Sequence, residues 1–212
     1  MEKGDLKRIQ GELSKLDEAR ERILKVSRQA VRLSGSAVIQ IHRFELGKAR
    51  KTLRRAEKTL SKLKALLKGN AGFKLPVSPP LAAFQEYAEA KLLFSFVSSG
   101  RIAPLREVNV DSSSYLLGLL DLVGELRRLT LNLLRGGETS KAEAALRAME
   151  EIYENLYSLD HTSLIPNFRR KMDGARRILE ATRSDLIAEL RRASLEEAIK
   201  GLEKRIARIG AR

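Results

Sequence analysis

The sequence predicts an all-α protein, a single-domain bundle of about six or seven helices. Hydrophobic residues make up 43% of its 212 residues, which is enough to form a folded core. Tryptophan is absent and aromatic residues are only 5% of the chain, while alanine, leucine, arginine, glutamate and lysine predominate, a balance that favours helix over sheet. Apolar residues recur at helical spacing through most of the chain, and no alternating strand pattern accompanies them.

The helices can be placed in order from this spacing and from the residues that interrupt it. Residues 5–68 have one clear interruption, LSGSAV near Gly35, and therefore form either one very long helix or two long ones. Further breaks fall at Pro79–Pro80, at Gly100 with Pro104, and at Gly136–Gly137. The remaining predicted helices are 81–99, 112–134 (capped by Asp111 or one of Ser112–Ser114), 139–158, 165–192 and 195–209.

The last predicted helix begins at a capping box formed by Ser194 and Glu197. Within one domain spanning 1–212, we treat 194–212 as an added C-terminal helical segment. This segment either closes the core or docks onto a neighbouring subunit. Its apolar residues alternate in steps of four and three, the spacing of a helix seam: Leu195, Ile199, Leu202, Ile206 and Ile209.

Charge and composition restrict the class of protein. The 41 lysines and arginines exceed the 27 acids, giving a net charge of +14, which indicates a polyanionic partner, most often nucleic acid. The alternative is a basic surface that is simply solvated. No apolar run approaches the ~20 residues of a membrane span, and the N-terminus MEKGDLKRIQ lacks an apolar signal core. Cysteine is absent, which excludes disulfides and thiolate metal sites. We expect a soluble cytoplasmic protein with no membrane partner.

A basic stripe runs beside the apolar face of the predicted helix that ends near residue 68. His42 lies on the apolar side and is interpreted as a core histidine rather than a ligand. We expect the stripe to bind RNA phosphates, together with Arg128 from a later helix. The predicted RNA-binding residues are Arg43, Arg50, Lys51, Arg54, Arg55, Lys58 and Arg128.

Four acids stand among apolar residues of two helices. In YLLGLLDLVGEL, Asp121 and Glu125 lie one helical turn apart on a narrow polar stripe. The same stripe contains Gly118, a small residue where something could approach. In FQEYAEA, Glu86 and Glu89 are spaced i, i+3 and also point toward the packed side.

If these two helices are antiparallel neighbours, the four carboxylates can meet, and so many negative charges require a cation. Oxygen ligands without histidine or cysteine favour Mg²⁺, Mn²⁺ or Ca²⁺ over zinc or iron. Such a site suits metal-assisted attack of water on phosphorus. The alternative is that Asp121 and Glu125 pair with arginines such as Arg128 and hold no metal.

Three segments, in order, resemble the translin family and its translin-associated factor X branch: FQEYAEAKLLFSFV, YLLGLLDLVGELRRLTLNLL and RRKMDGARRILEATRSDLIAEL. Upstream, ERILKVSRQAVRLSGSAVIQIHR is similar to the first-helix region of that branch, so the resemblance covers about 20–190. The resemblance implies a translin-like fold and an Mg²⁺-dependent endoribonuclease with Glu-x-x-Glu and Asp-x-x-x-Glu pairs. The matching positions here are Glu86, Glu89, Asp121 and Glu125.

The resemblance also implies assembly. Family members form octameric shells with RNA inside, and eukaryotic members of this branch pair with a translin subunit. We therefore expect a homo-oligomer, with a translin-like partner subunit as the alternative. The longer basic N-terminal region of eukaryotic members is absent, so nuclear targeting is not implied.

The leading functional hypothesis is an endoribonuclease that uses Mg²⁺, or Mn²⁺ in its place, on single-stranded RNA. Aromatic residues are sparse, so we expect electrostatic contacts with little sequence selectivity. Three alternatives remain open. The first is a translin-like shell that binds single-stranded RNA or DNA without cleaving it. The second is an all-α nucleotide pyrophosphatase, whose second acid pair is usually Glu-x-x-Asp. The third is a structural oligomer with all four acids in salt bridges.

Overall fold

A computed structural model describes residues 3–70, 79–160 and 162–210 of the chain. These residues contain seven α-helices and one short 3₁₀ turn, without any β-strand, so the all-α prediction is confirmed. None of the helices described combines the length and apolar character that a membrane span requires. The chain divides into two compact units, Met1–Leu122 and Val123–Arg212. The prediction of a single domain stays a prediction.

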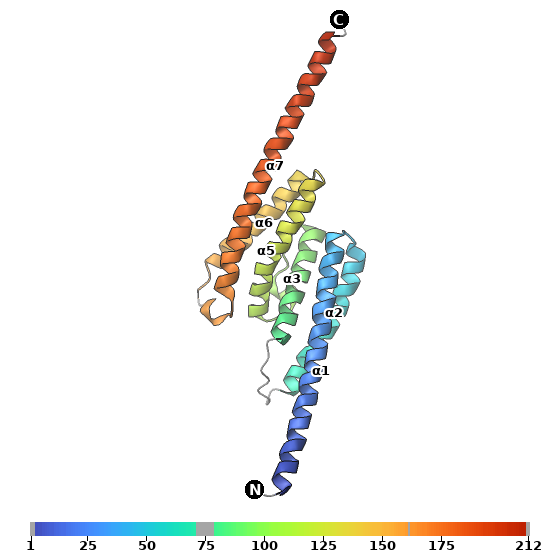
Figure 1. Cartoon of the computed structure of the whole chain (residues 1–212), viewed down its shortest axis with the longest axis vertical. Coiled ribbons are helices and arrows are strands. Elements are labelled where there is room, and N and C mark those ends of the chain that lie inside the picture. Colours follow the sequence, from blue (N-terminus) through green and yellow to red (C-terminus); the bar gives the residue numbers. More distant parts are fainter. Residues whose placement is uncertain (1–2, 71–78, 161, 211–212) are drawn as a thin grey trace. The chain divides into compact units, whose positions relative to one another are not determined.

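The first unit is built on three long helices: α1 (Lys3–His42), α2 (Leu46–Gly69) and α3 (Pro79–Ser99) (Figure 1). Each of the three packs against the other two. Alanines at the contacts have no exposed surface, so the helix backbones can approach closely. The buried residues form one face of α1 and of α2, whereas α3 is buried around most of its circumference, and they include Ala30, Ala37, Ala49, Ala56, Ala83 and Ala88.

The break in the N-terminal helical region lies elsewhere than predicted. Helix α1 runs through Gly35 without interruption and ends at His42, so the interpretation as two long helices is confirmed but the predicted position of the break is wrong. A glycine inside a helix costs only about 1 kcal/mol relative to alanine, which packing of α1 against two neighbours offsets. The chain turns at Phe44, whose φ is 58°, and the Glu45 amide donates to Gln40 O at 2.9 Å.

Two short connections lead into α5 (Ser112–Arg135). Helix α3 ends at Ser99, and Gly100 after it has φ of 69°. The one-turn helix α4 (Leu105–Val108) follows, which the sequence did not predict. Asp111 caps α5, as predicted: it accepts hydrogen bonds from Ser114 N at 2.9 Å and Ser114 Oγ at 2.6 Å. The predicted loop before α3 lies mostly outside the described residues, which resume at Pro79.

The second unit contains the C-terminal part of α5, α6 (Thr139–Tyr157), the 3₁₀ turn η1 (Thr162–Leu164) and α7 (Phe168–Gly210). The turn into α6 uses Gly137 with φ of 76°, the left-handed conformation that favours glycine. Arg127 joins α5 to α7: its guanidinium donates to Thr182 Oγ1 at 3.0 Å and pairs with Asp185 at 2.9 Å. Helices α6 and α7 pack together through a buried apolar face.

The predicted helices 165–192 and 195–209 are one continuous helix, α7, so the predicted capping box at Ser194 and Glu197 is wrong. No proline or glycine stands between Arg192 and Leu195, and a solvent-exposed serine is tolerated inside a helix. The Arg192 guanidinium also bridges the predicted break, because it bonds to Glu189 on one side and to Glu196, at 3.0 Å, on the other.

Candidate functional site

The first acid pair, Glu86 and Glu89, lies near the middle of α3 at the border of its buried face. Both glutamates are partly buried. Between them, Tyr87 is 2% exposed and Ala88 has no exposed surface. The spacing i, i+3 therefore places both carboxylates along one edge of the packed side, as the sequence predicted for this helix.

The polar stripe of α5 meets α3 at Gly118. A Cβ atom built on Gly118 would lie 2.7 Å from Ala88 Cβ and 3.1 Å from Glu89 N. Both distances are shorter than ordinary van der Waals contact, so a glycine is required where the two helix backbones approach. The sequence predicted that another group could approach the helix at Gly118, and that group is the backbone of α3.

A hydrogen bond fixes the register of the two helices one turn further along. The Gln85 side-chain amide donates to Asp121 Oδ2. At the other end, Tyr115 Oη donates to Ala103 O at 2.9 Å. Successive α5 residues 115, 118 and 121 thus contact residues 103, 88 and 85, which come earlier and earlier in the chain. This part of α5 therefore runs antiparallel to α3, the arrangement that the predicted meeting of the four acids requires.

Gln85 is the residue that sequence reasoning missed at this site. It precedes Glu89 by four positions and so shares its helix face, a signal that could have found it. Its side-chain amide donates a hydrogen bond to one oxygen of Asp121, a carboxylate that the sequence predicted as a metal ligand. Asp121 itself is partly buried, and a hydrogen bond to an ionised carboxylate lowers the cost of that burial.

Glu125, the fourth predicted acid, lies one turn beyond Asp121 on α5 and belongs to the second unit. Its side chain is 23% exposed, and Arg128 Nη1 lies 3.9 Å from Glu125 Oε2. At this length the contact is a weak ion pair rather than a hydrogen bond. Arg128 therefore offsets part of the charge of Glu125. The alternative hypothesis, in which the acids pair with arginines and hold no metal, predicted such a contact.

These residues fit a divalent cation in donor chemistry, but not in their side-chain arrangement. All four offer carboxylate oxygens, the ligands that Mg²⁺ prefers, and α3 touches α5 at Gly118. Among the described residues, however, no group of three or more histidines, cysteines or acids could hold a metal ion as arranged. Coordination by Asp121 would require it to exchange the Gln85 amide for the ion. The metal site stays a prediction.

The predicted RNA-binding residues are all exposed, six of them on α2 or in the turn before it. The five on α2 lie opposite its buried face, formed by Ala49, Leu53, Ala56, Leu60 and Leu63, so the predicted amphipathic helix is confirmed. The Arg50 guanidinium lies over the Phe94 ring, 5.6 Å from its centroid, which orients one cation of the stripe. The exposed residues are Arg43, Arg50, Lys51, Arg54, Arg55, Lys58 and Arg128. His42 is partly buried at the end of α1.

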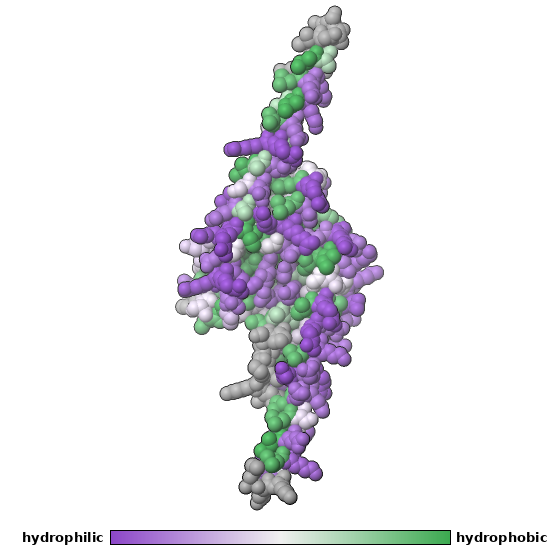
Figure 2. Space-filling view, in the orientation of Figure 1, coloured by the Kyte–Doolittle hydropathy of each residue, from purple (hydrophilic) through white to green (hydrophobic). Residues whose placement is uncertain are grey.

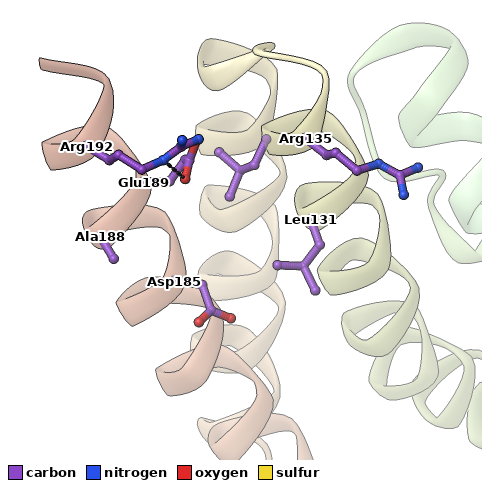
Figure 3. A pocket seen from close by; sticks show the side chains of 7 residues that line it. Leu131, Arg135, Asp185, Ala188, Glu189 and Arg192 are labelled. Carbon is purple, nitrogen blue, oxygen red and sulfur yellow. Dashed lines mark hydrogen bonds and ion pairs between the residues drawn. The ribbon is translucent and has the colours of Figure 1, made fainter. Parts of the chain in front are cut away.

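A separate cavity in the second unit lies between the end of α5 and α7 (Figure 3). Leu131, Leu134 and Arg135 line it from α5, and four residues of α7 line it from the other side. Two of its charged groups, Glu189 and Arg192, are bonded to each other, and its other acid, Asp185, pairs with Arg127. The lining residues do not include any of the predicted site residues.

Comparison with known proteins defines the class to which this helical architecture belongs. The model of the translin family matches residues 18–180, and the chain belongs to the translin family. An uncharacterised protein of Methanocaldococcus jannaschii is 30% identical over 193 residues, which cover 90% of this chain and 85% of that protein.

Solved structures of two other proteins are also similar to this chain. A duplex RNA complex of AfC3PO shares 31% identity and a TM-score of 0.77, over 87% of this chain and 96% of that one. A crystal structure of apo-NeC3PO shares 26% identity and the same TM-score, over 89% and 98%. The chain therefore has the translin fold and is similar to the C3PO proteins.

Proposed function

We propose that this protein binds RNA and cleaves it internally with the help of a divalent cation, as a subunit like translin-associated factor X. The observation that carries the proposal is the contact of α3 with α5 at Gly118, which brings the turns that bear Glu89 and Asp121 together. The similarity to AfC3PO, whose structure includes duplex RNA, supports RNA as the ligand.

The grip on RNA is assigned to the exposed cations of α2. Arg50, Arg54 and Lys58 follow one another at spacings of about 6 Å along the helix axis, and they face solvent. Lysines and arginines that contact phosphates supply affinity that does not depend on base sequence and weakens as salt rises. Because the similar AfC3PO structure contains a duplex, duplex and single-stranded RNA are both to be tested as substrates.

The chemistry is assigned to Glu86, Glu89, Asp121 and Glu125. When bound, Mg²⁺ or Mn²⁺ supplies an activated water and neutralises charge on the phosphate oxygens. The carboxylates would hold the cation, and their partly buried positions on two packed helices limit their movement. Gln85 would orient Asp121, and Arg128 is close enough to Glu125 to keep its charge compensated.

Replacing single acids tests the assignment. Asp121→Asn and Glu89→Gln should each reduce Mg²⁺-dependent cleavage of labelled RNA by about 100-fold or more. Loss of a residue that only supports a metal ligand typically lowers activity about 10–100-fold, and loss of a ligand itself should lower it further. RNA affinity should change little because the α2 stripe is untouched. Glu154→Gln, an exposed acid on α6, is the matched control. Cleavage by the two site variants at the wild-type rate would show that these acids are not catalytic.

The second candidate function is an RNA-binding shell subunit without turnover. Two contacts favour it: Gln85 already bonds to Asp121, and Arg128 already pairs with Glu125, so these carboxylates are stabilised without an ion. Under this function, RNA binds with or without EDTA, and neither Mg²⁺ nor Mn²⁺ produces cleavage. Product formation that EDTA abolishes would exclude it.

Assembly and location complete the proposal. We propose a homo-oligomer, with the octameric shell of the family as the expected size and a translin-like partner subunit as the alternative. Native mass spectrometry of the purified chain decides between them, because a partner is needed only if the chain alone fails to assemble. A cytoplasmic location stays a prediction from the sequence.

A further inference from the structure

The C-terminal part of α7 lies outside the packed region of its unit. Up to Leu186, buried side chains recur along the helix, from Phe168 through Leu179. From Arg191 onward, every residue whose side chain is described is exposed. Helix α7 continues past the turn between α5 and α6 (Figure 1). The family match ends at residue 180, so this segment lies beyond the matched region.

This segment exposes large apolar side chains on a single stripe. Leu195 is 62% exposed, Ile199 47%, Leu202 57% and Ile206 68%. Apolar residues gather on the described part of the segment in Figure 2. Single exposed leucines need no explanation, but a contiguous apolar stripe on a helix marks an interaction surface. We call these four residues the α7 seam.

The residue types in the α7 seam indicate how many helices it joins. The steps of four, three and four place Leu195 and Leu202 at d positions of a heptad, and Ile199 and Ile206 at a positions. β-Branched residues at a with leucine at d favour a parallel coiled coil of two strands. The preceding a position is Arg192, at the edge of the cavity beside α5 (Figure 3), so the seam begins where α7 leaves its neighbours.

The flanking charges indicate which partner fits. In a parallel pair, a g residue faces the e residue five positions further along the other helix. Arg191 at g then faces Glu196 at e of the second copy, an attractive pair. An antiparallel pair of the same helices would instead place e against e, bringing together Glu196 and Glu203 of the two copies. Like charges in such positions repel, so the parallel arrangement is favoured.

A second exposed stripe, at the start of α1, does not share this pattern. Leu6, Ile9 and Leu13 are 49%, 46% and 59% exposed, but leucine takes the a positions and isoleucine takes d. That order shifts the preference away from two strands. A parallel self-pair of α1 would also set Glu12 against Asp17 of the other copy, which is repulsive.

We propose that the α7 seam binds the same seam of a second copy of this chain as a parallel, two-stranded coiled coil. The partner is specified by a and d residues that match the two-stranded preference and by one pair of flanking charges, Arg191 and Glu196, that attract in the parallel arrangement. The segment from Ala188 to Ile209 comprises about three heptads, ~33 Å of helix, a short coiled coil.

Cysteine cross-linking tests the proposal directly, because the chain has no cysteine of its own. Leu202→Cys and Leu195→Cys should each form disulfide-linked dimers under mild oxidation, at least about tenfold faster than Lys204→Cys, which points away from the seam at an f position. An antiparallel pair would give efficient cross-linking at no more than one of the two seam positions. Equal rates at Leu202→Cys and Lys204→Cys would overturn the proposal.

A second pair of variants separates a seam contact from accidental collision. In the Leu195→Cys background, Leu202→Asp should slow cross-linking by about tenfold, since a charge at d is buried in the paired state. Gly201→Asp adds the same charge one residue away, on the outer side at c, and should leave the rate unchanged. All these positions are solvent-exposed, so the variants should fold. Equal effects of the two aspartates would also overturn the proposal.

Discussion

The packing around Gly118 and the C-terminal part of α7 depart in opposite directions from the rule that apolar side chains are buried and polar ones exposed. Around Gly118, the acids Glu89 and Asp121 lie partly buried beside the packed apolar residues of α3 and α5. In the α7 seam, leucine and isoleucine are exposed on a helix that is otherwise charged.

The difference lies in where each departure is compensated. Asp121 finds a hydrogen-bond partner within its own unit, Gln85, which offsets the cost of burying a carboxylate. An apolar side chain has no such local compensation, because only removal from water stabilises it. Compensation of Asp121 therefore needs no second molecule, whereas burial of the exposed apolar side chains of the α7 seam requires one.

The largest effect on stability is expected at Gly118. Gly118→Ala would place a Cβ 2.7 Å from Ala88 Cβ, which cannot rotate away, so α3 has to shift. We expect the free energy of unfolding in urea to fall by about 1–3 kcal/mol. Gly124→Ala is the matched control, because a Cβ there meets nothing within 4 Å and alanine favours the helix by about 1 kcal/mol. Equal effects of the two substitutions would contradict close packing at Gly118.

An intermediate effect is expected at Tyr87, which shares α3 with the acids. Its hydroxyl is buried and has no hydrogen-bond partner among the described residues. Tyr87→Phe should therefore raise the free energy of unfolding by about 1 kcal/mol at pH 7. Tyr157→Phe, at a side chain that is 75% exposed, should change it by less than about 0.5 kcal/mol. Destabilisation by Tyr87→Phe would show that the hydroxyl is bonded.

The same tyrosine predicts a dependence on pH. Burial, and to a smaller extent the charge of Glu57, raises the pKa of Tyr87 above its ordinary value. The folded state then resists ionisation that the unfolded chain undergoes near pH 10. The stabilisation is present below pH 10 and is lost as pH rises further, by up to about 1.4 kcal/mol per pH unit. Urea unfolding between pH 9 and pH 11 should show a shallower decline in Tyr87→Phe than in the wild type.

The smallest effect is expected in the α7 seam of a dilute, unpaired chain. Leu202→Ala shortens a side chain that is 57% exposed. At nanomolar protein concentration, the free energy of unfolding should therefore change by less than about 0.5 kcal/mol. At high concentration, the same variant should lose stability relative to the wild type, because pairing stabilises only the folded state. A large effect at high dilution would mean that the seam packs within its own chain.

Much of the fold could be predicted from local signals. Asp111 and the serines after it located the start of α5 without deciding which residue caps it, and Gly136–Gly137 identified its end, because capping and left-handed turns depend on residue types close in sequence. The predicted break near Gly35 was wrong because that position depends on contacts distant in sequence. Packing of α1 against two other helices overrides a weak local preference, and the sequence alone does not reveal that packing.

By itself, the sequence determined the helical class, the basic face of α2, the positions of the four acids and the heptad order of the α7 seam. Each of these depends on residue type and on a fixed helical period. Only the tertiary structure decided that α3 fills the space at Gly118, that Gln85 bonds to Asp121, and that the seam remains uncovered. These facts depend on which residues distant in sequence meet, and the period of a single helix does not specify that.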